Sequence, residues 1–237
     1  MCVAPAQVSD ESMVAMADES ELSTAERLVN ATVSLLAEHG PSAIKAREVA
    51  AKAGMSTMVV YSHHGGIPEL ISAAVDYGFR QLEKSFAAAE ITDDPVTDLF
   101  RIALITRELA RGNPHLYDAM FGLSNRATYR PAHPDKAVRR SGHSPAFKAG
   151  FAHVTDACTR LAATGRVEVN DVDAVAGALW SFVHGFITLE LADHFTDFED
   201  PVMQVLVPMG VTFMVGLGDD PDRARASHEA ALSRQVR

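Results

Sequence analysis

Residues 44–70 read IKAREVAAKAGMSTMVVYSHHGGIPEL, and the spacing of small, apolar and turn-forming residues in this stretch is typical of a helix-turn-helix. The two helices of such a motif cross closely, which requires a small residue at the crossing, and Ala50 meets this need. Four residues later, Gly54 can adopt the left-handed conformation that the turn requires. One inner face of the motif is apolar and comprises Val49, Ala53, Met55 and Val60. The stretch predicts that the chain binds DNA.

The outward side chains of the second helix are those that DNA would meet. Ser56 is a suitable N-cap, and with Thr57 and Met58 it stands where backbone amides favour phosphate and side chains first reach base edges. The residues about one turn later can donate hydrogen bonds to phosphate oxygens and comprise Tyr61, Ser62 and His63. Taken singly, Tyr61 is equally interpretable as a half-buried packing residue and His63 as an ordinary residue near the helix end. Their combined spacing favours DNA binding.

The run from about Ser23 to Leu82 resembles the N-terminal domain of TetR-type transcriptional regulators. The resemblance rests on a first helix that ends in EHG, on the segment REVAAKAGMS and on the segment VVYSHHGGIPEL. It implies that Tyr61 and His63 contact the DNA backbone. It also implies that Thr57 and Met58 read bases.

Three positions depart from the pattern of that family. Lys45 stands where the family usually has a serine or threonine, His64 where it usually has an aromatic residue, and Ile67 where it usually has a lysine that contacts phosphate. Lys45 can still bind a phosphate as a point charge. With Arg47, it completes the residues that we expect to contact DNA.

The charge of the chain is unusual for a protein that binds nucleic acid. Its formal net charge is -10 over 237 residues. Residues 1–22 contain acidic but no basic side chains, and in residues 23–70 four basic residues balance four acidic ones. DNA affinity must therefore depend on helix dipoles, hydroxyl groups and a symmetric pair of motifs, which predicts a gentle salt dependence.

The rest of the pattern is helical and predicts an all-α chain of two domains with about nine to ten helices. Helices are expected at Thr24–His39, after Pro68, after Pro95, at Pro114–Leu123 and at Phe147–Ala163. The expected organisation is a tail over residues 1–20, a helix-turn-helix domain over 21–82 with its motif at about 44–63, a ligand-binding and dimerisation domain over 83–219, and a tail over 220–237. Residues 125–144 have the composition of a loop; their positive charge leaves a second DNA contact open as an alternative.

Two later segments, residues 171–195 and 202–217, are apolar around most of the helix circumference and must be covered on all sides. Membrane insertion would cover them, but both segments are interrupted by polar or helix-breaking residues, namely Ser181, His184, Glu190, Gln204, Pro208 and Gly210. We therefore expect these helices to pair with the same helices of a second copy, forming a homodimer without membrane contact. Such a dimer places two recognition helices on an operator of palindromic sequence.

The segment WSFVHGF, residues 180–186, resembles the Trp-His-Gly (WHG) signature of one C-terminal domain type in TetR-like regulators. Trp180 and His184 share a helix face and can line one cavity. The alternative is a core tryptophan beside a hydrogen-bonded histidine. The other residues expected at a ligand pocket lie on inward stripes and are Ile102, Thr106, Met120, Phe121 and Phe151. Such a pocket suits a hydrophobic or amphipathic effector with His184 as its polar anchor.

Several other functions are disfavoured by the sequence. The ten histidines include no pair at the spacing of a helical metal site, and no nucleophile motif or phosphate loop is present, so neither an enzyme, a cofactor nor a metal is expected. The two cysteines, Cys2 and Cys158, give no disulfide framework, and the N-terminus lacks the pattern of a signal peptide. A cytoplasmic location is expected.

Together these features predict a ligand-responsive transcriptional regulator that binds double-stranded operator DNA. The form we favour is a repressor that a small molecule releases from its operator. A transcriptional activator and a ligand-independent DNA-binding protein are the alternatives.

Overall fold

The computed structural model describes residues 22–121 and 144–233. All regular structure in these ranges is helical, with ten α-helices and no strand, which confirms the all-α prediction. The tail predicted for residues 1–20 and residues 125–143 of the predicted loop lie outside the described residues.

The described residues divide into two compact units. Residues 22–74 form the first unit, and residues 75–121 with 144–233 form the second. Helix α5 (Ile67–Ala88) continues from the first unit into the second. The boundary predicted after residue 82 also falls within this helix.

The first unit begins with α2 (Thr24–His39), whose bounds are those predicted from the sequence. A capping box fixes its start, because the Ser23 hydroxyl accepts from the Glu26 amide while the Glu26 carboxylate accepts from the Ser23 amide at 2.9 Å. Gly40 ends the helix with φ 71°. A short 3₁₀ turn (Pro41–Ala43) then leads to α3 (Ala46–Lys52) and α4 (Thr57–His64).

The core of the first unit contains three residues of the predicted inner face of the helix-turn-helix, Val49, Ala53 and Val60, whereas Met55 is only half-buried. Val49 and Val60 are fully buried and Ala50 is 2% exposed, as close packing of α2, α3 and α4 requires. Gly54 makes the turn with φ 67°, a conformation that costs other residues energy. Arg27 of α2 donates to the carbonyl oxygen of Ala53 at 3.1 Å and so ties α2 to this turn.

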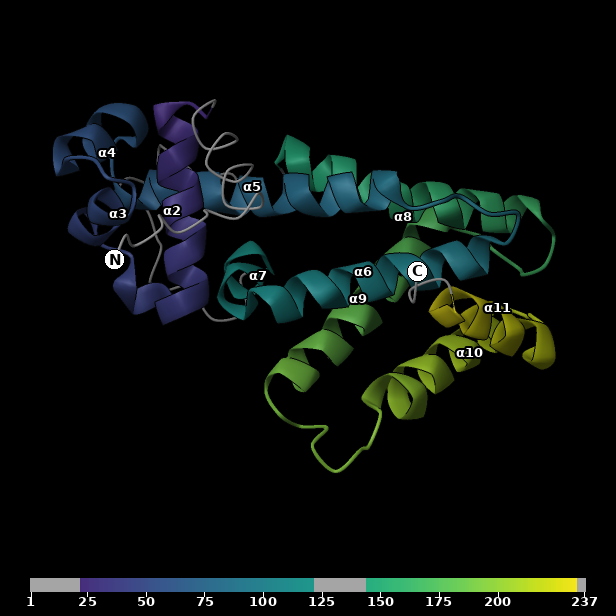
Figure 1. Ribbon diagram of the computed structural model, residues 1–237. Helices are drawn as coiled ribbons and strands as arrows, with labels where there is room; N and C mark the ends of the chain where they lie inside the picture. Colours follow the sequence, from purple (N-terminus) through teal and green to yellow (C-terminus); the bar gives the residue numbers. More distant parts are fainter. Residues whose placement is uncertain (1–21, 122–143, 234–237) are drawn as a thin grey trace, which may run out of the picture. The chain divides into compact units, whose positions relative to one another are not determined.

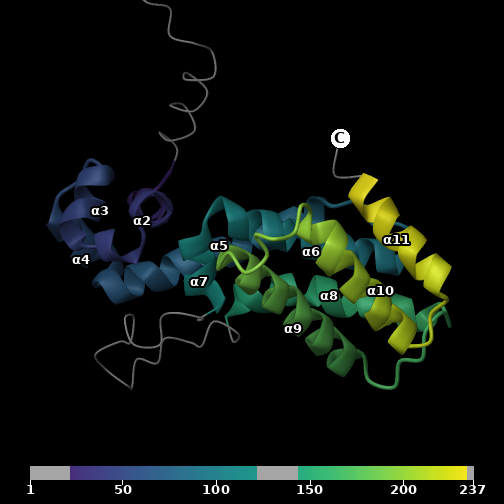
Figure 2. The ribbon, with the colours of Figure 1, turned by 90° about the horizontal axis from the view of Figure 1, so that it is seen from below.

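The second unit is organised around α6 (Pro95–Gly112), which packs against α7 (Pro114–Phe121), α8 (Pro145–Ala163), α9 (Val172–Leu191) and α11 (Pro221–Ser233). A π-helical turn (Val202–Leu206) leads into α10 (Val207–Gly216). Helices α10 and α11 lie side by side, as Figures 1 and 2 show. The two predicted all-round apolar segments correspond to α9 and to the π-helical turn with α10.

The prediction of a C-terminal tail over residues 220–237 is wrong for residues 221–233, which form α11. Its buried stripe contains Ala224, Ser227, His228 and Ala231, at the spacing of one helix face. A Cβ atom at Gly210 of α10 would collide with the His228 ring, so glycine permits the close approach of the two helices. The stripe is short of large apolar residues, which explains why sequence hydropathy did not reveal a packed helix.

A buried ionic network joins the ends of α6, α8 and α11. The guanidinium of Arg166 is 2% exposed and pairs with Asp94 at 2.8 Å and with Asp219 at 2.7 Å. It also donates to the Ser227 hydroxyl at 3.0 Å. Asp94 caps α6 by accepting from the Val96 amide, so the same carboxylate starts that helix and holds the arginine.

We predict that Arg166→Ala lowers the free energy of unfolding by about 3–5 kcal/mol, because it leaves the Asp219 carboxylate, whose side chain is 1% exposed, without its cation in the interior. Urea denaturation of the full chain measures this change. Arg225→Ala, at an exposed arginine of α11, is the matched control and should shift stability by less than about 0.5 kcal/mol. Equal effects of the two substitutions would contradict a structural role for the network.

Candidate functional site

Helix α4 turns its predicted DNA-contacting side chains to solvent. The exposed residues are Thr57, Met58, Tyr61, Ser62 and His63, while Val60 on the opposite face is fully buried. Met58 is 73% exposed and Tyr61 is 55% exposed. Tyr61 is therefore not the half-buried packing residue of the alternative interpretation.

The N-caps of the two motif helices make no capping hydrogen bond through their side chains. Ser56 occupies the N-cap of α4 as predicted, with φ -86° and ψ 155°, yet its hydroxyl does not accept from the helix amides. Lys45 occupies the N-cap of α3, and its side chain cannot accept a hydrogen bond there. Both exposed side chains can therefore turn to an outside partner.

Two of the four basic residues between positions 23 and 70 are engaged within the unit. Lys52 binds both carboxylate oxygens of Glu38, at 2.7 and 2.8 Å, and with Ser34 it lowers the pKa of that carboxyl. Arg27 holds the carbonyl of Ala53. Lys45 and Arg47 are exposed and form no ion pair within the described part of the chain. Counting charges in the sequence could not reveal that only two of these four cations are left without a partner in the described part of the unit, because the pairings join residues 14 and 26 positions apart.

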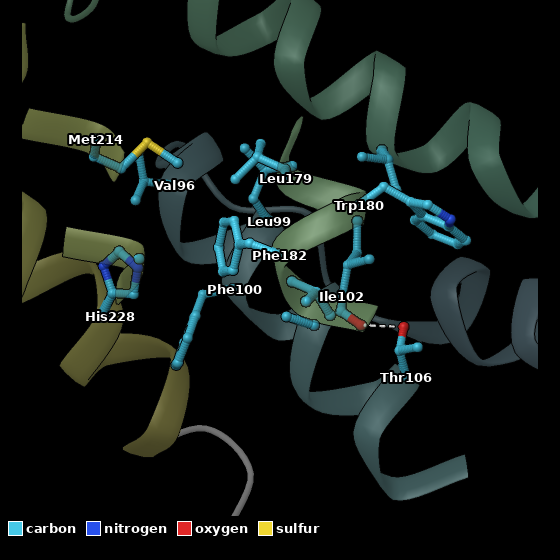
Figure 3. Close-up of a pocket in the computed structure, with 14 residues that line it drawn as sticks. Val96, Leu99, Phe100, Ile102, Thr106, Leu179, Trp180, Phe182, Met214 and His228 are labelled. Carbon is cyan, nitrogen blue, oxygen red and sulfur yellow. Dashed lines mark hydrogen bonds between the residues drawn. The ribbon is translucent and has the colours of Figure 1, made fainter. Parts of the chain in front are cut away.

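The second unit holds an apolar cavity of about 30 Å³ between α6, α9, α10 and α11. Figure 3 shows His228 and Trp180 toward its two ends, with Phe100, Phe182 and Leu99 between them. Of the predicted ligand residues, Ile102, Thr106 and Trp180 line this cavity, and Met120, Phe121, Phe151 and His184 do not.

His228 is a cavity residue that the sequence reasoning missed, because it was assigned to a tail. Its Nδ1 lies 2.8 Å from the carbonyl oxygen of Ala224, so Nδ1 carries the proton and donates it. Burial lowers the pKa of His228 and keeps the ring neutral. The other polar groups on the lining are few, and the Thr106 hydroxyl already donates to the carbonyl of Ile102 at 2.8 Å.

The predicted residues away from the cavity gather in an aromatic cluster that shares Trp180 with it. The His184 ring lies 4.3 Å from Trp180 and 4.1 Å from Phe121, centroid to centroid, and Phe151 meets Trp180 edge-on at 5.3 Å. Met120 is fully buried and packs against Gly78 of α5. The structure thus brings Phe121, Phe151, Trp180 and His184 together.

His184 carries a buried polar atom that has no hydrogen-bond partner among the described residues. Burial lowers the pKa of His184 to about 3, so the imidazole is neutral at pH 7. The Tyr117 hydroxyl oxygen lies 2.5 Å from His184 Nδ1. A separation this short is typical of an O–H donor, and burial raises the pKa of Tyr117, so the phenol keeps its proton and donates it. The imidazole proton then resides on Nε2, which is buried without a hydrogen-bond partner.

A wider, polar groove of about 550 Å³ lies between the C-terminal ends of α6 and α9 and the segment that follows α9. Arg107 on its wall binds Glu190 through two hydrogen bonds of 2.7 Å each. This groove contains none of the predicted ligand residues.

The part of the chain that the structure describes contains no group of side chains placed to bind a metal ion and no exposed cysteine. No three histidine, cysteine, aspartate or glutamate side chains there are placed to hold a metal ion. Cys158 is buried, and burial raises its pKa to about 11.

Two family models match the chain. One describes bacterial regulatory proteins of the tetR family and matches residues 28–74, which include the helix-turn-helix. The other describes a tetracyclin repressor-like C-terminal domain and matches residues 99–209, which include the segment from Trp180 to Phe186. No curated protein matches the sequence.

Solved structures share the fold at low sequence identity. A protein of unknown function from Rhodococcus sp. RHA1 is 22% identical, with a TM-score of 0.68 over 83% of this chain and 96% of its own. RolR in complex with resorcinol is 15% identical, with a TM-score of 0.61 over 90% of this chain and 95% of its own. The transcriptional regulator FadR from Bacillus subtilis, in complex with stearoyl-CoA, is 14% identical, with a TM-score of 0.54 over 71% of this chain and 88% of its own.

We predict that His184 makes the protein less stable as the pH falls from about 6.5 toward 3. Over this range the unfolded histidine binds a proton and the folded one does not, so the free energy of unfolding decreases as the pH falls. Urea denaturation at several pH values should show a smaller decrease for His184→Gln than for the unchanged chain. Equal decreases would mean that the buried imidazole does not resist protonation.

Proposed function

The chain belongs to the TetR family of bacterial regulatory proteins, and from this premise we propose that it is a repressor that a small hydrophobic or amphipathic molecule releases from its operator. The observation that carries the DNA-binding part is the exposed face of α4 above a fully buried Val60, inside the matched range 28–74. A cytoplasmic location and the absence of catalytic activity go with this role.

In this proposal α4 enters the major groove of the operator. Thr57 and Met58 in its first turn face base edges, with Ser56 beside them. The residues that contact the DNA backbone are Lys45, Arg47, Tyr61, Ser62 and His63. The DNA-binding unit then needs a second copy to reach useful affinity, because among its described residues only Lys45 and Arg47 are cations without a partner in the unit.

The proposed homodimer forms through α9 and through the π-helical turn with α10. By length and composition, α9 is apolar enough to cross a membrane. Only 28% of its most apolar stretch of 18 residues is buried, so most of this stretch is left uncovered. Its exposed face is rich in small residues, namely Ala174, Ala178, Ser181 and Gly185, and ends at Leu189. Met203, Met209 and Val215 add exposed apolar side chains from the second segment. A second copy covers this surface by a four-helix contact and places two DNA-binding units on a palindromic operator.

The proposed effector binds beside Trp180 and enlarges the cavity. The present volume of about 30 Å³ suits a water molecule, whereas ligand pockets measure about 300–1,000 Å³. An effector must therefore favour a state in which Trp180 has moved away from its neighbours. The unpartnered Nε2–H of His184 is a donor that an effector oxygen can satisfy.

Aromatic contacts link Trp180 to α5. The Trp180 ring contacts Phe121 at 5.9 Å and Phe147 at 6.0 Å, and both of these contact Phe79 of α5 at about 5.5 Å. Because α5 continues to residue 67 in the first unit, an effector that shifts Trp180 also biases the helix that enters the DNA-binding unit. RolR with resorcinol and FadR with stearoyl-CoA, both of similar fold, support a ligand-binding role for the second unit.

We predict a shallow salt dependence of operator binding. For an operator selected from random DNA, the slope of log affinity against log salt should be about -4 or shallower. Each DNA-binding unit of the dimer contributes two cations, and each cation releases about 0.9 counterion. Lys45→Ala should reduce the slope by about 2 in the dimer. Lys52→Ala is the matched control and should leave it unchanged, because Glu38 already holds Lys52. A slope near -8 contradicts this assignment of charges, and failure to select any DNA contradicts the function.

We predict that effector binding changes the fluorescence of Trp180, the only tryptophan in the chain. A panel of small neutral aromatic compounds with an oxygen acceptor, titrated with and without operator, measures both binding and release. His184→Leu should weaken the binding of an active compound about 3–10-fold, the worth of one hydrogen bond, while His194→Leu, at an exposed histidine, should not. Unaltered DNA binding across all compounds that bind would favour the ligand-independent alternative, and strengthened DNA binding would favour an activator.

A further inference from the structure

We propose that Met58 reads the C5 methyl group of a thymine in each operator half-site, and that this apolar contact is the main direct discrimination between bases made by α4. The inference rests on the proposed function and adds which base feature the protein selects. It starts from the chemistry that α4 carries and the chemistry that it lacks.

Helix α4 lacks the side chains that read purines. Bidentate recognition of guanine requires arginine or lysine, and that of adenine requires asparagine or glutamine. The helix reads TMVVYSHH and contains none of these four residue types. The two basic side chains without a partner in the described unit are Lys45, the N-cap of α3, and Arg47 within α3, which is the helix that crosses the DNA backbone in this motif.

The hydroxyl groups of α4 do not replace them. Ser56 and Thr57 can reach base edges, but serine and threonine bond to more than one base and discriminate weakly. The Ser62 hydroxyl donates to the carbonyl of Val59 at 3.2 Å, so its proton is already used. Tyr61 and His63 stand one turn or more beyond the helix start, where contact with phosphate is expected.

Met58 offers the largest exposed apolar side chain in the first turn of α4, whereas Thr57 beside it offers a single methyl group. Met58 is the second residue of α4, in the turn that faces base edges, and 73% of it is exposed although Val60, two residues on, is fully buried. A methionine this exposed contributes nothing to the core of its own unit. Its flexible thioether can fit against a methyl group, and in the major groove thymine is the base that presents one.

The size of the effect follows from the loss of one buried methyl group. Removing it should weaken binding about fourfold in each half-site, because burial of one such group contributes roughly that factor. The two half-sites are far apart, so their effects should multiply to about 15-fold.

The test uses the full chain and an operator selected from random DNA, with each thymine replaced in turn by deoxyuridine, which pairs identically but lacks the methyl group. We expect one position per half-site at which the replacement weakens binding about fourfold. The same replacement should have no effect on Met58→Ala. Ile91→Ala is the matched control, since Ile91 is 74% exposed and belongs to the second unit, and it should respond to deoxyuridine as the unchanged chain does.

The outcomes separate the inference from the function on which it rests. Selection of a specific operator whose thymines can all be replaced without loss overturns the role of Met58 and leaves DNA binding intact. A deoxyuridine effect that persists in Met58→Ala also overturns it, because another residue then contacts the methyl group. If no DNA is selected, the proposed function and this inference fail together.

Discussion

The burial of α6 is the constraint on which the second unit depends. Every residue from Pro95 to Phe100 is buried, including the carboxylate of Asp98, so the start of this helix cannot be left to solvent. Arg160 pairs with Asp98 at 2.6 Å, and Arg166 pairs with Asp94 at 2.8 Å. Both arginines come from the region around the end of α8, which is therefore drawn onto the start of α6.

The same constraint explains why α11 is part of the fold. Arg166 needs more acceptors than Asp94 supplies, and Asp219 and Ser227 provide them from the chain before and within α11. Once α11 is held there, His228 is buried against Phe100 at 4.5 Å and forms one end of the cavity. The cavity proposed for the effector is thus bounded by a helix whose position is fixed by charge pairing and not by large apolar side chains.

Local signals in the sequence were sufficient for the first unit. Each of these signals depends on residues close together in the sequence: the capping box joins Ser23 and Glu26, Gly54 alone supplies the positive φ of the turn, and the buried Val60 stands next to the exposed Tyr61. The family models then confirmed the family to which the sequence had been assigned by resemblance.

The lining of the cavity could be predicted only in part, because an inward stripe does not distinguish a cavity wall from a packed core. Ile102 and Trp180 line the cavity, whereas Met120 fills space against α5, although all three lie on inward stripes. The hydrogen bond between Tyr117 and His184 joins residues 67 positions apart and leaves no trace in local spacing. His228 was missed because alanine and serine flank it on a stripe of low hydropathy.

In the proposed mechanism, the small cavity of the second unit limits effector binding, and the lack of net charge on the DNA-binding unit makes the operator easy to release. A cavity of about 30 Å³ is too small for an effector, so the effector first has to select a minor state with a larger cavity, and its apparent affinity falls by the fraction of molecules in that state. One DNA-binding unit, with Lys45 and Arg47 as its partner-free cations among the described residues, binds DNA weakly by itself. A change in the spacing of the two units of a dimer is therefore enough to release the operator. The coupling between the operator-binding and effector-binding sites is reciprocal. Operator DNA that favours the state with the small cavity must therefore weaken effector binding by the same factor by which the effector weakens DNA binding. In this mechanism the size of that factor depends on the aromatic contacts that run from Trp180 through Phe121 to Phe79 of α5. These contacts determine how far a movement of Trp180 shifts α5.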